Sequence, residues 1–203
     1  MDNYQFAVKD LTKFYNGKKV LDIPYLVIKK GMIYGVMGTN GSGKTTLLSV
    51  LSLLIKPTSG RVYFDGLEID SRDNDDSILR RQITMVLQNP FLLNSTVEKN
   101  VAYGLRIRGL SKREQKQKVV ECLGLVGLAG FEKRRAHELS GGEAQRVAIA
   151  RGIAVTPKVL FLDEPTANVD KTHIDVLENI IKELNRRYKT TIIFTTHDLN
   201  QAY

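Results

Sequence analysis

Nine residues in the first quarter of the chain constrain its fold more than any other stretch, and we call them the phosphate loop: Gly38, Thr39, Asn40, Gly41, Ser42, Gly43, Lys44, Thr45 and Thr46. The apolar residues 32–37 before them predict a buried strand, and residues 47–51 after them predict a helix. A strand, a glycine-rich loop and a helix in this order are the context in which G-x-x-x-x-G-K-[ST] binds phosphate. The alternative, a glycine-rich turn with a chance lysine, is disfavoured by these flanks.

Each residue type in the phosphate loop has a chemical reason. Gly38, Gly41 and Gly43 allow backbone angles that side chains forbid, so successive N–H groups can point at phosphate oxygens. The positive end of the following helix faces the same anion. We expect Lys44 to reach the β- and γ-phosphates of a nucleotide, and the hydroxyl of Thr45 to ligate Mg²⁺.

The composition is ordinary for a soluble globular protein. The chain has 203 residues, 42% of them hydrophobic and 26% charged, which is enough for a full core in one or two domains. No apolar run approaches the ~20 residues of a membrane span, and residues 1–4 lack the pattern of a signal peptide, so we do not expect export. The single cysteine, Cys122, fits a reducing compartment, and its apolar neighbours predict a core position.

The net charge of +8 comes from 30 basic and 22 acidic residues. The basic residues are dispersed, and the densest group, residues 112–118, alternates with Glu114 and two glutamines. This group is typical of a solvated helix face. We therefore expect no nucleic-acid partner, and the charge is only a weak indication of work near an anionic surface.

The first thirty residues predict a hairpin. Residues 4–8 and 20–28 alternate as strands do, and the pair Asn16-Gly17 lies between them. Pro24 interrupts the second run and indicates an edge strand or a bulge. Tyr15, just before the turn, is placed either to stack on a nucleotide base or to cover the sheet, and spacing alone does not decide between the two.

After the phosphate loop the pattern alternates between helix and strand. A helix is predicted over residues 44–55, a strand over residues 61–66 and an acidic surface connection over residues 70–76. A short apolar strand over residues 83–87 ends at Gln88. Since ligands of parallel α/β sheets gather at the carboxyl ends of strands, we expect Gln88 to approach the site, unless it only caps a turn.

Residues 96–155 read as a helical insertion between two parts of one sheet. Ser111 with Glu114 forms a capping-box pattern, and Ser140 with Glu143 repeats it. Gly141 and its neighbour Gly142 leave the backbone N–H groups of the second helix uncovered, which predicts a second anion-binding helix end. An ordinary capped helix is the alternative, although a glycine costs about 1 kcal/mol in a helix.

The apolar residues 159–162 predict a central strand that ends in Asp163 and Glu164. Buried acids need a partner, and Mg²⁺ supplies one for Asp163, while Glu164 is placed to polarise a water for attack on the γ-phosphate. An amphipathic helix capped by Thr172 follows, and its predicted buried stripe is Ile174, Leu177, Ile181, Leu184 and Tyr188. The strand over residues 191–195 then leads to His197, which we expect to hydrogen-bond the γ-phosphate. His137 and His173 are interpreted as solvated.

With all these parts in one order, the chain resembles the nucleotide-binding subunit of ABC transporters along essentially its whole length. The most specific part is residues 139–146, Leu-Ser-Gly-Gly-Glu-Ala-Gln-Arg, which look like the signature motif of that family. We call residues 139–146 the signature segment; its motif residues are Leu139, Ser140, Gly141, Gly142 and Glu143. The resemblance implies an α/β fold: a P-loop NTPase core with a mostly parallel sheet, an N-terminal antiparallel β subdomain and an inserted α-helical subdomain.

The resemblance also implies roles, position by position. Tyr15 matches the aromatic residue that stacks on adenine, and Gln88 the glutamine that contacts Mg²⁺ and the attacking water and senses the membrane partner. Asp163 matches the acid on the metal side, Glu164 the general base and His197 the switch histidine, while residues 167–170, with Asp170, match a loop that crosses the dimer interface. The resemblance implies ATP and Mg²⁺ as cofactors. In the family the signature segment caps the γ-phosphate bound by a second subunit, which implies a head-to-tail dimer.

The partners implied are a second copy of the chain, transmembrane permease subunits and, indirectly, a solute-binding protein, with the chain cytoplasmic and peripheral on the inner face of the membrane. We expect one ABC ATPase domain over residues 1–203, with residues 1–87 and 157–203 as the nucleotide-binding core and residues 88–156 as the helical subdomain. Family members run some tens of residues past the histidine, so we expect the C-terminal part of the usual domain to be missing here.

Segments at residues 21–24, 57–60, 96–106 and 143–145 look like importers of tungstate or molybdate. The main hypothesis is therefore the ATP-hydrolysing subunit of such an importer. Two alternatives stay open: an exporter or soluble ABC protein, and a nucleotide-binding regulatory module with little hydrolysis.

Overall fold

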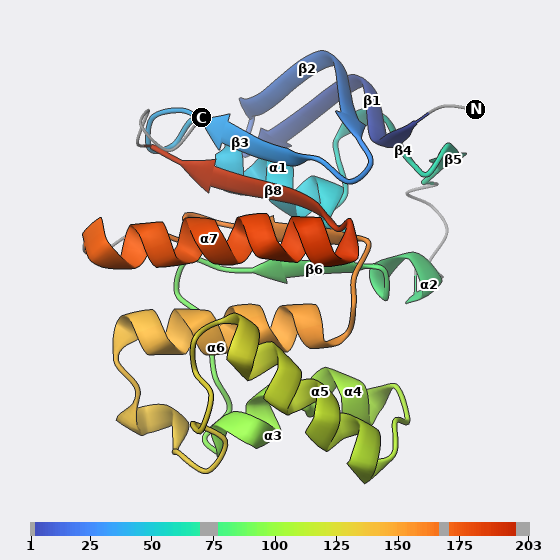
Figure 1. Cartoon of the computed structure of the whole chain (residues 1–203). Coiled ribbons are helices and arrows are strands. Elements are labelled where there is room, and N and C mark those ends of the chain that lie inside the picture. Colours follow the sequence, from blue (N-terminus) through green and yellow to red (C-terminus); the bar gives the residue numbers. More distant parts are fainter. Residues whose placement is uncertain (1–2, 70–76, 167–170, 198–203) are drawn as a thin grey trace.

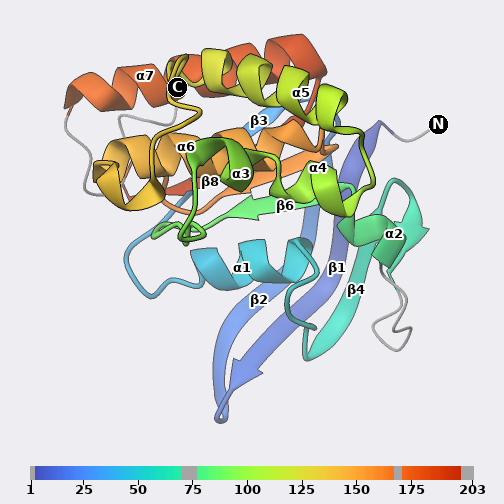
Figure 2. The ribbon, with the colours of Figure 1, turned by 90° about the horizontal axis from the view of Figure 1, so that it is seen from below.

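The computed structural model of the chain describes residues 3–69, 77–166 and 171–197, apart from the side chains of residues 171–173. Two four-stranded sheets organise these residues, one antiparallel and one parallel. Figures 1 and 2 show the antiparallel sheet on one side of the parallel sheet and helices α3 to α6 on the other. The predicted α/β class is confirmed.

The antiparallel sheet consists of β1 (Tyr4–Tyr15), β2 (Lys18–Lys29), β4 (Ser59–Phe64) and β5 (Leu67–Glu68), in the order β2-β1-β4-β5. The predicted hairpin is confirmed, because β1 and β2 pair around Asn16 and Gly17, which both have positive φ. Both strands are longer than the alternation indicated. Pro24 lies in β2, an edge strand, where its missing N–H costs no ladder bond to a second neighbour.

The parallel sheet consists of β3 (Ile33–Met37), β6 (Ile83–Val86), β7 (Val159–Leu162) and β8 (Thr191–Thr196), in the order β3-β8-β7-β6. Every residue of β7 is buried, as predicted for a central strand. The prediction that β3 is buried is wrong: Ile33 is 37% and Met37 47% exposed. The reason is that only one face of β3 is covered: residues 33, 35 and 37 are exposed, whereas Tyr34 and Val36 pack against the core.

The helix after the phosphate loop, α1 (Lys44–Leu51), ends four residues before the predicted boundary. The chain turns at Leu53, which has a φ of 61°, so the backbone leaves the helical path there. Leu47, Leu48 and Leu51 of α1 are buried between the two sheets, together with Phe6 of β1 and Phe161 of β7. This core holds the end of the phosphate loop in place.

The predicted helical insertion is confirmed. It contains α3 (Val97–Val101), α4 (Tyr103–Ile107), α5 (Lys112–Leu125), a 3₁₀ turn η1 (Ala136–Glu138) and α6 (Gly141–Ala154); a four-residue helix, α2 (Ser77–Arg80), precedes β6. Both predicted capping boxes form, at Ser111 with Glu114 and at Ser140 with Glu143. In this part of the chain the structure describes no strand, only an isolated bridge between Thr96 and Arg135.

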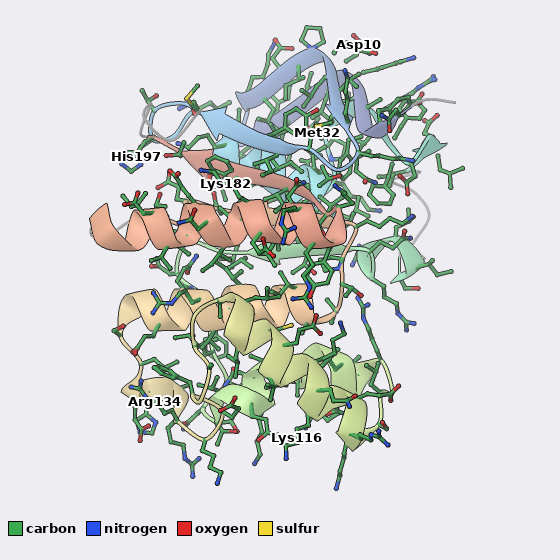
Figure 3. All side chains as sticks on the ribbon, in the orientation of Figure 1. Asp10, Met32, Lys116, Arg134, Lys182 and His197 are labelled. Atoms are coloured by element: carbon green, nitrogen blue, oxygen red, sulfur yellow. The ribbon has the colours of Figure 1, made fainter. Side chains whose placement is uncertain are left out.

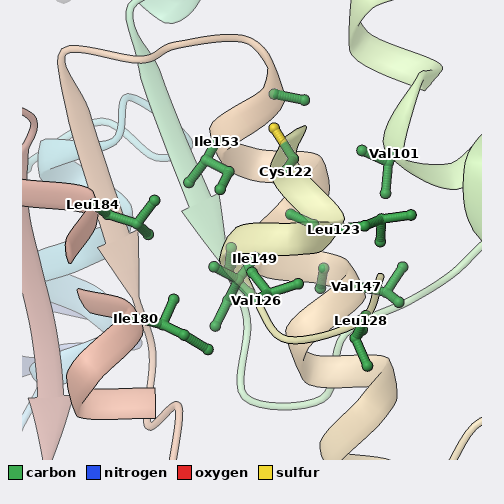
Figure 4. Packing of buried hydrophobic residues seen from close by; sticks show 14 of the residues in the cluster. Val101, Cys122, Leu123, Val126, Leu128, Val147, Ile149, Ile153, Ile180 and Leu184 are labelled. Carbon is green, nitrogen blue, oxygen red and sulfur yellow. The ribbon is translucent and has the colours of Figure 1, made fainter. Parts of the chain in front are cut away.

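A second apolar core joins these helices to the sheet. Figure 4 shows α5 and α6 packed together, with Leu123 and Ile149 inside, and α7 (Lys171–Tyr188) contributing Ile180 and Leu184. Cys122 is buried here as predicted, and burial raises the pKa of its thiol to about 12. None of the described helices combines the length and the apolar character needed to cross a bilayer.

Candidate functional site

The carboxyl ends of all four parallel strands meet at one edge of the sheet, at the left in Figure 1. An open cavity of about 340 Å³ lies there. Its lining comes from segments far apart in sequence: Val20, Asn40, Gly41, Gly43, Lys44, Thr45, Thr46, Gln88 and Glu164. The sequence placed six of the phosphate-loop residues, Gln88 and Glu164 in one site, and the structure brings them together.

The backbone of the phosphate loop explains two of its glycines in different ways. Gly43 has a φ of 93°, and a Cβ there would lie 2.8 Å from the carbonyl oxygen of Val20, so only glycine fits. Gly38 has no positive φ, which corrects the prediction that it supplies an angle forbidden to side chains. A Cβ at Gly38 would lie 2.5 Å from Oγ of Ser42, so the serine side chain would have to turn away.

The start of α1 is open to an anion. Gly43 caps the helix without a side-chain hydrogen bond, and the first turn carries no acidic residue. The free N–H groups and the helix dipole therefore face the cavity uncompensated. This end of the helix fits a phosphate group, and the cavity next to it is lined mostly by polar residues.

Lys44 is 7% exposed, and its ammonium group is held by three oxygens. It donates to the carbonyl oxygens of Gly38 at 2.9 Å and Thr39 at 3.2 Å, and it lies 3.3 Å from Oε1 of Glu164. Buried charges are stable only when paired in this way. The predicted base and the predicted phosphate-binding lysine are thus in direct contact.

Glu164 also lies near the predicted switch histidine. Its Oε2 is 3.7 Å from Nδ1 of His197, and its side chain is 15% exposed while that of His197 is 60% exposed. The backbone of Glu164 has a φ of 43°, an uncommon conformation for a residue with a side chain. Its N–H donates to Oγ1 of Thr195 at 2.7 Å, which holds this strained turn.

The donor set expected for Mg²⁺ is also assembled. The hydroxyls of Thr45 and Thr195 donate to Oδ1 of Asp163, at 3.1 Å and 2.8 Å, and Asp163 is 5% exposed. Hydroxyl, carboxylate and amide oxygens are ligands that suit Mg²⁺, which takes few protein ligands and completes its shell with phosphates and water. Thr45 and Asp163 are in contact, and Gln88 lines the same cavity as Thr45, so the three residues fit the ion.

Sequence reasoning missed Thr195 and Val20. Thr195 is fully buried and joins the two acids, since it donates to Asp163 and accepts from Glu164. A polar residue at the carboxyl end of a buried strand was the available signal. Val20 carries no such signal, because its part in the site is the approach of its backbone to Gly43.

We expect Thr195→Val to lower turnover about 10- to 100-fold, because the two acids lose their common support and small misplacements of catalytic groups are costly. The free energy of unfolding should also fall by about 1–3 kcal/mol, since two buried groups lose a hydrogen-bond partner. Steady-state phosphate release and thermal unfolding measure the two effects.

Thr191→Val is the matched control. Thr191 is equally buried, lies at the other end of the same strand and makes two hydrogen bonds of its own, with Gln5 and with the N–H of Gly31. The Thr191→Val variant should lose a comparable amount of stability and keep its turnover. Equal loss of turnover in both variants would show that Thr195 acts only through stability.

Several predicted residues lie outside the cavity. Tyr15 does not line it; its ring is 46% exposed at the end of β1, with the ammonium of Lys13 5.1 Å from its centre. His137 is exposed in η1, as interpreted from the sequence. Asp170 and residues 167–169 lie outside the described residues, as do the side chains of Thr172 and His173.

The signature segment does not reach the cavity of its own chain. No residue from Leu139 to Glu143 lines it, although the start of α6 faces the same side of the molecule as the phosphate loop (Figure 1). Ser140 caps α6 by accepting from the N–H of Glu143 at 3.3 Å, and Gly141 is exposed with open space above it. One chain thus presents two separate helix starts: that of α1 has no side-chain cap, whereas that of α6 is closed by the capping box of Ser140 and Glu143.

The profile of the protein family described as ABC transporter matches residues 21–167. Among curated proteins, the chain is 42% identical to the tungstate uptake system ATP-binding protein TupC of Peptoclostridium acidaminophilum, over 98% of this chain and 89% of that one. It is 40% identical to the Fe(3+) ions import ATP-binding protein FbpC 1 of Haemophilus influenzae, of which it spans only 61%.

Solved structures agree. The chain is 34% identical to cbiO1 from Clostridium perfringens, part of the ABC transporter complex cbiONQ, with a TM-score of 0.90 over 97% of this chain and 80% of that one. It is also 34% identical to the ATP-binding cassette MJ0796, in a dimeric post-hydrolysis state bound to ADP and Pi, with a TM-score of 0.88 over 97% of this chain and 90% of that one.

Proposed function

The chain belongs to the ABC transporter family and is an enzyme that hydrolyses ATP with Mg²⁺, and we propose that it drives import as one of two head-to-tail copies on a membrane permease. The observation that carries the catalytic part of the proposal is the contact of Glu164 with Lys44, both of which line a cavity beside an open helix end, and the approach of His197 to Glu164 at 3.7 Å. A phosphate-binding cation, a base and a polar contact for the γ-phosphate are what phosphoryl transfer to water requires.

In the proposed mechanism the ATP phosphates lie on the open start of α1 and take Lys44 from its present partners, because they carry more negative charge than a single carboxylate. This releases Glu164, whose carboxylate accepts the proton of the attacking water. His197 contacts the γ-phosphate, and Tyr15 stacks on the adenine. Thr45, Asp163 and Gln88 hold Mg²⁺, which neutralises charge on the phosphates when bound.

The proposed dimer follows from the two helix ends. The start of α6 is exposed at Gly141, yet it lies outside the cavity of its own chain. A second copy placed head-to-tail brings the signature segment of one chain over the phosphate loop of the other. Asp170 is proposed to lie at this interface. The dimeric state of the cassette MJ0796, bound to ADP and Pi, supports a two-chain arrangement.

Sedimentation of the Glu164→Gln variant with and without Mg-ATP tests the dimer. The substitution removes the base, so bound ATP persists and the two-chain complex should accumulate. We expect a monomer without nucleotide and a dimer with Mg-ATP. A chain that binds ATP and stays monomeric at all concentrations would contradict the proposal.

We propose that the permease docks in an apolar groove beside Gln88. This cavity of about 260 Å³ lies between the end of β6 and helices α4 and α6, and its lining includes Leu87, Phe91 and Tyr103. These three side chains are 49%, 77% and 40% exposed. An exposed apolar cluster of this kind marks an interaction surface. Its position next to Gln88, which lines the ATP cavity, links the permease to the catalytic site.

We expect Phe91→Ser to lower retention of the chain on permease-containing membranes about tenfold or more, because a large exposed aromatic ring is a typical interface anchor. Tyr25→Ser is the control, since Tyr25 is 65% exposed but lies on β2 in the other sheet. Membrane co-sedimentation measures both. Equal retention of the Phe91 variant and the unmodified chain would exclude the groove as the docking site.

For the transported solute we propose an oxyanion such as tungstate or molybdate. The tungstate relative matches almost its whole length, whereas the chain spans 61% or less of the Fe(3+) relatives and 45% of the glycine betaine/carnitine relative GbuA. In source cells carrying Glu164→Gln, uptake of tungstate should fall to background while Fe(3+) uptake is unchanged. Loss of Fe(3+) uptake alone would contradict the assignment. We also propose that a solute-binding protein acts outside the cell and that this chain lies on the inner face of the membrane.

A further inference from the structure

The start of α6 carries a negative charge of its own. The carboxylate of Glu143 accepts from the N–H of Ser140 at 2.7 Å, which closes the capping box. That backbone hydrogen bond, with smaller contributions from the Ser140 side chain and Arg134, outweighs partial burial and holds the pKa of Glu143 below its usual range. Glu143 is therefore ionised at neutral pH.

An ionised Glu143 conflicts with the proposed use of this helix end. A carboxylate in the first turn already satisfies part of the helix dipole and repels a second anion. The partner's γ-phosphate is to be held by the same turn, at Ser140 and Gly141. A negative charge on Glu143 that no cation neutralises would thus weaken the contact on which the dimer depends.

Arg134 lies against this carboxylate and is held in place from several sides. Its Nη1 donates to Oε1 of Glu143 at 3.1 Å and its Nη2 to the carbonyl oxygen of Glu138 at 3.1 Å. The guanidinium stacks on the ring of Phe131, 4.4 Å from its centre. The backbone is fixed as well, because its carbonyl accepts from the N–H of Val97 at 2.9 Å.

Figure 3 labels Arg134 on the same side of the molecule as His197, with α7 and α6 between them in this view. Arg134 is thus beside the start of α6, which it contacts through Glu143, and it does not line the cavity of its own chain. We therefore expect its charge to act on an anion that approaches α6.

We propose that Arg134 is a positioning residue for the signature segment: it neutralises Glu143 and keeps the carboxylate turned toward the N–H of Ser140. The start of α6 then remains attractive to the γ-phosphate on the partner chain. This inference rests on the proposed function, because it requires the signature segment to bind the nucleotide of a second copy. A partly exposed ion pair contributes little to folding stability, so the effect should be on the dimer.

The test uses the full chain with Glu164→Gln, and measures by light scattering the ATP concentration that gives half-maximal dimerisation. Adding Arg134→Gln should raise this concentration about three- to tenfold, the effect of one uncompensated charge at short range. Adding Glu143→Gln to Arg134→Gln should restore it to within about twofold, because no charge is left to compensate. Lys133→Gln removes one exposed positive charge from the same loop and is the control.

Salt concentration separates charge from structure. The defect of Arg134→Gln should shrink between low and high ionic strength, since it is electrostatic. If Arg134→Gln has no effect, or if its defect is unchanged by salt and by Glu143→Gln, Arg134 only supports the loop and the inference is wrong. If the parent variant binds ATP but never dimerises, the proposed function itself fails, and the inference with it.

Discussion

Glu164→Gln is expected to lower Mg-ATP turnover by about 10²–10⁴-fold and to leave ATP affinity within a few-fold, since this is the usual contribution of a general base. Glutamine has the size of glutamate and keeps the backbone bond to Thr195, so the turn should persist. What is lost is the negative charge that lies between Lys44 and His197. Phosphate release gives turnover, and equilibrium binding gives the affinity.

The control is Glu178→Gln, which neutralises a partly exposed glutamate on α7 that pairs only loosely with Lys182, at 3.5 Å. It should change neither quantity. Turnover of the Glu164 variant near that of the unmodified chain would exclude Glu164 as the base. If the Glu164 variant lost much of its affinity for ATP, Glu164 would mainly hold Lys44 in place.

Ser140→Arg is expected to abolish turnover while the ATP affinity of the monomer stays within a few-fold. The long side chain fills the space above Gly141, where the partner's γ-phosphate is to bind. It also removes the cap of α6, since the N–H of Glu143 loses its acceptor, at a cost of about 1 kcal/mol in stability. Affinity is measured at concentrations where the chain is monomeric.

A matched control isolates the loss of stability that comes from removing the helix cap. Ser111 caps α5 with the same capping box, and its hydroxyl accepts from the N–H of Glu114 at 3.3 Å. Ser111→Arg should lose similar stability and keep its turnover, because Ser111 neither lines the cavity nor belongs to the signature segment. If Ser140→Arg weakens ATP binding in the monomer in proportion to its lost turnover, the signature segment acts on its own chain's phosphate.

Local signals predicted much of the fold. The hairpin, both capping boxes and the buried strand β7 depend on short-range chemistry that a sequence displays directly. The exposure of β3 could not be predicted in this way, because its apolar residues look the same whether one face of the strand or both faces are covered. The early end of α1 at Leu51 likewise depends on a backbone turn at Leu53 that no glycine or proline marks.

The site was predictable for a topological reason. Carboxyl ends of parallel strands share one edge, so the phosphate loop, Gln88, Glu164 and His197 could be placed together before any coordinates. Contacts through backbone or through a second residue were not predictable. Val20 acts by its carbonyl oxygen, and Arg134 by an ion pair with Glu143, nine positions further along the chain.

Mg-ATP turnover per chain, measured as a function of protein concentration with Glu164→Gln as the blank, tests the two-chain active site most directly. If each site is built by two chains, turnover per chain rises with concentration and levels off once the dimer is saturated. Turnover that exceeds the blank and stays constant down to the lowest concentration would contradict this account, because a single chain would then be sufficient for catalysis.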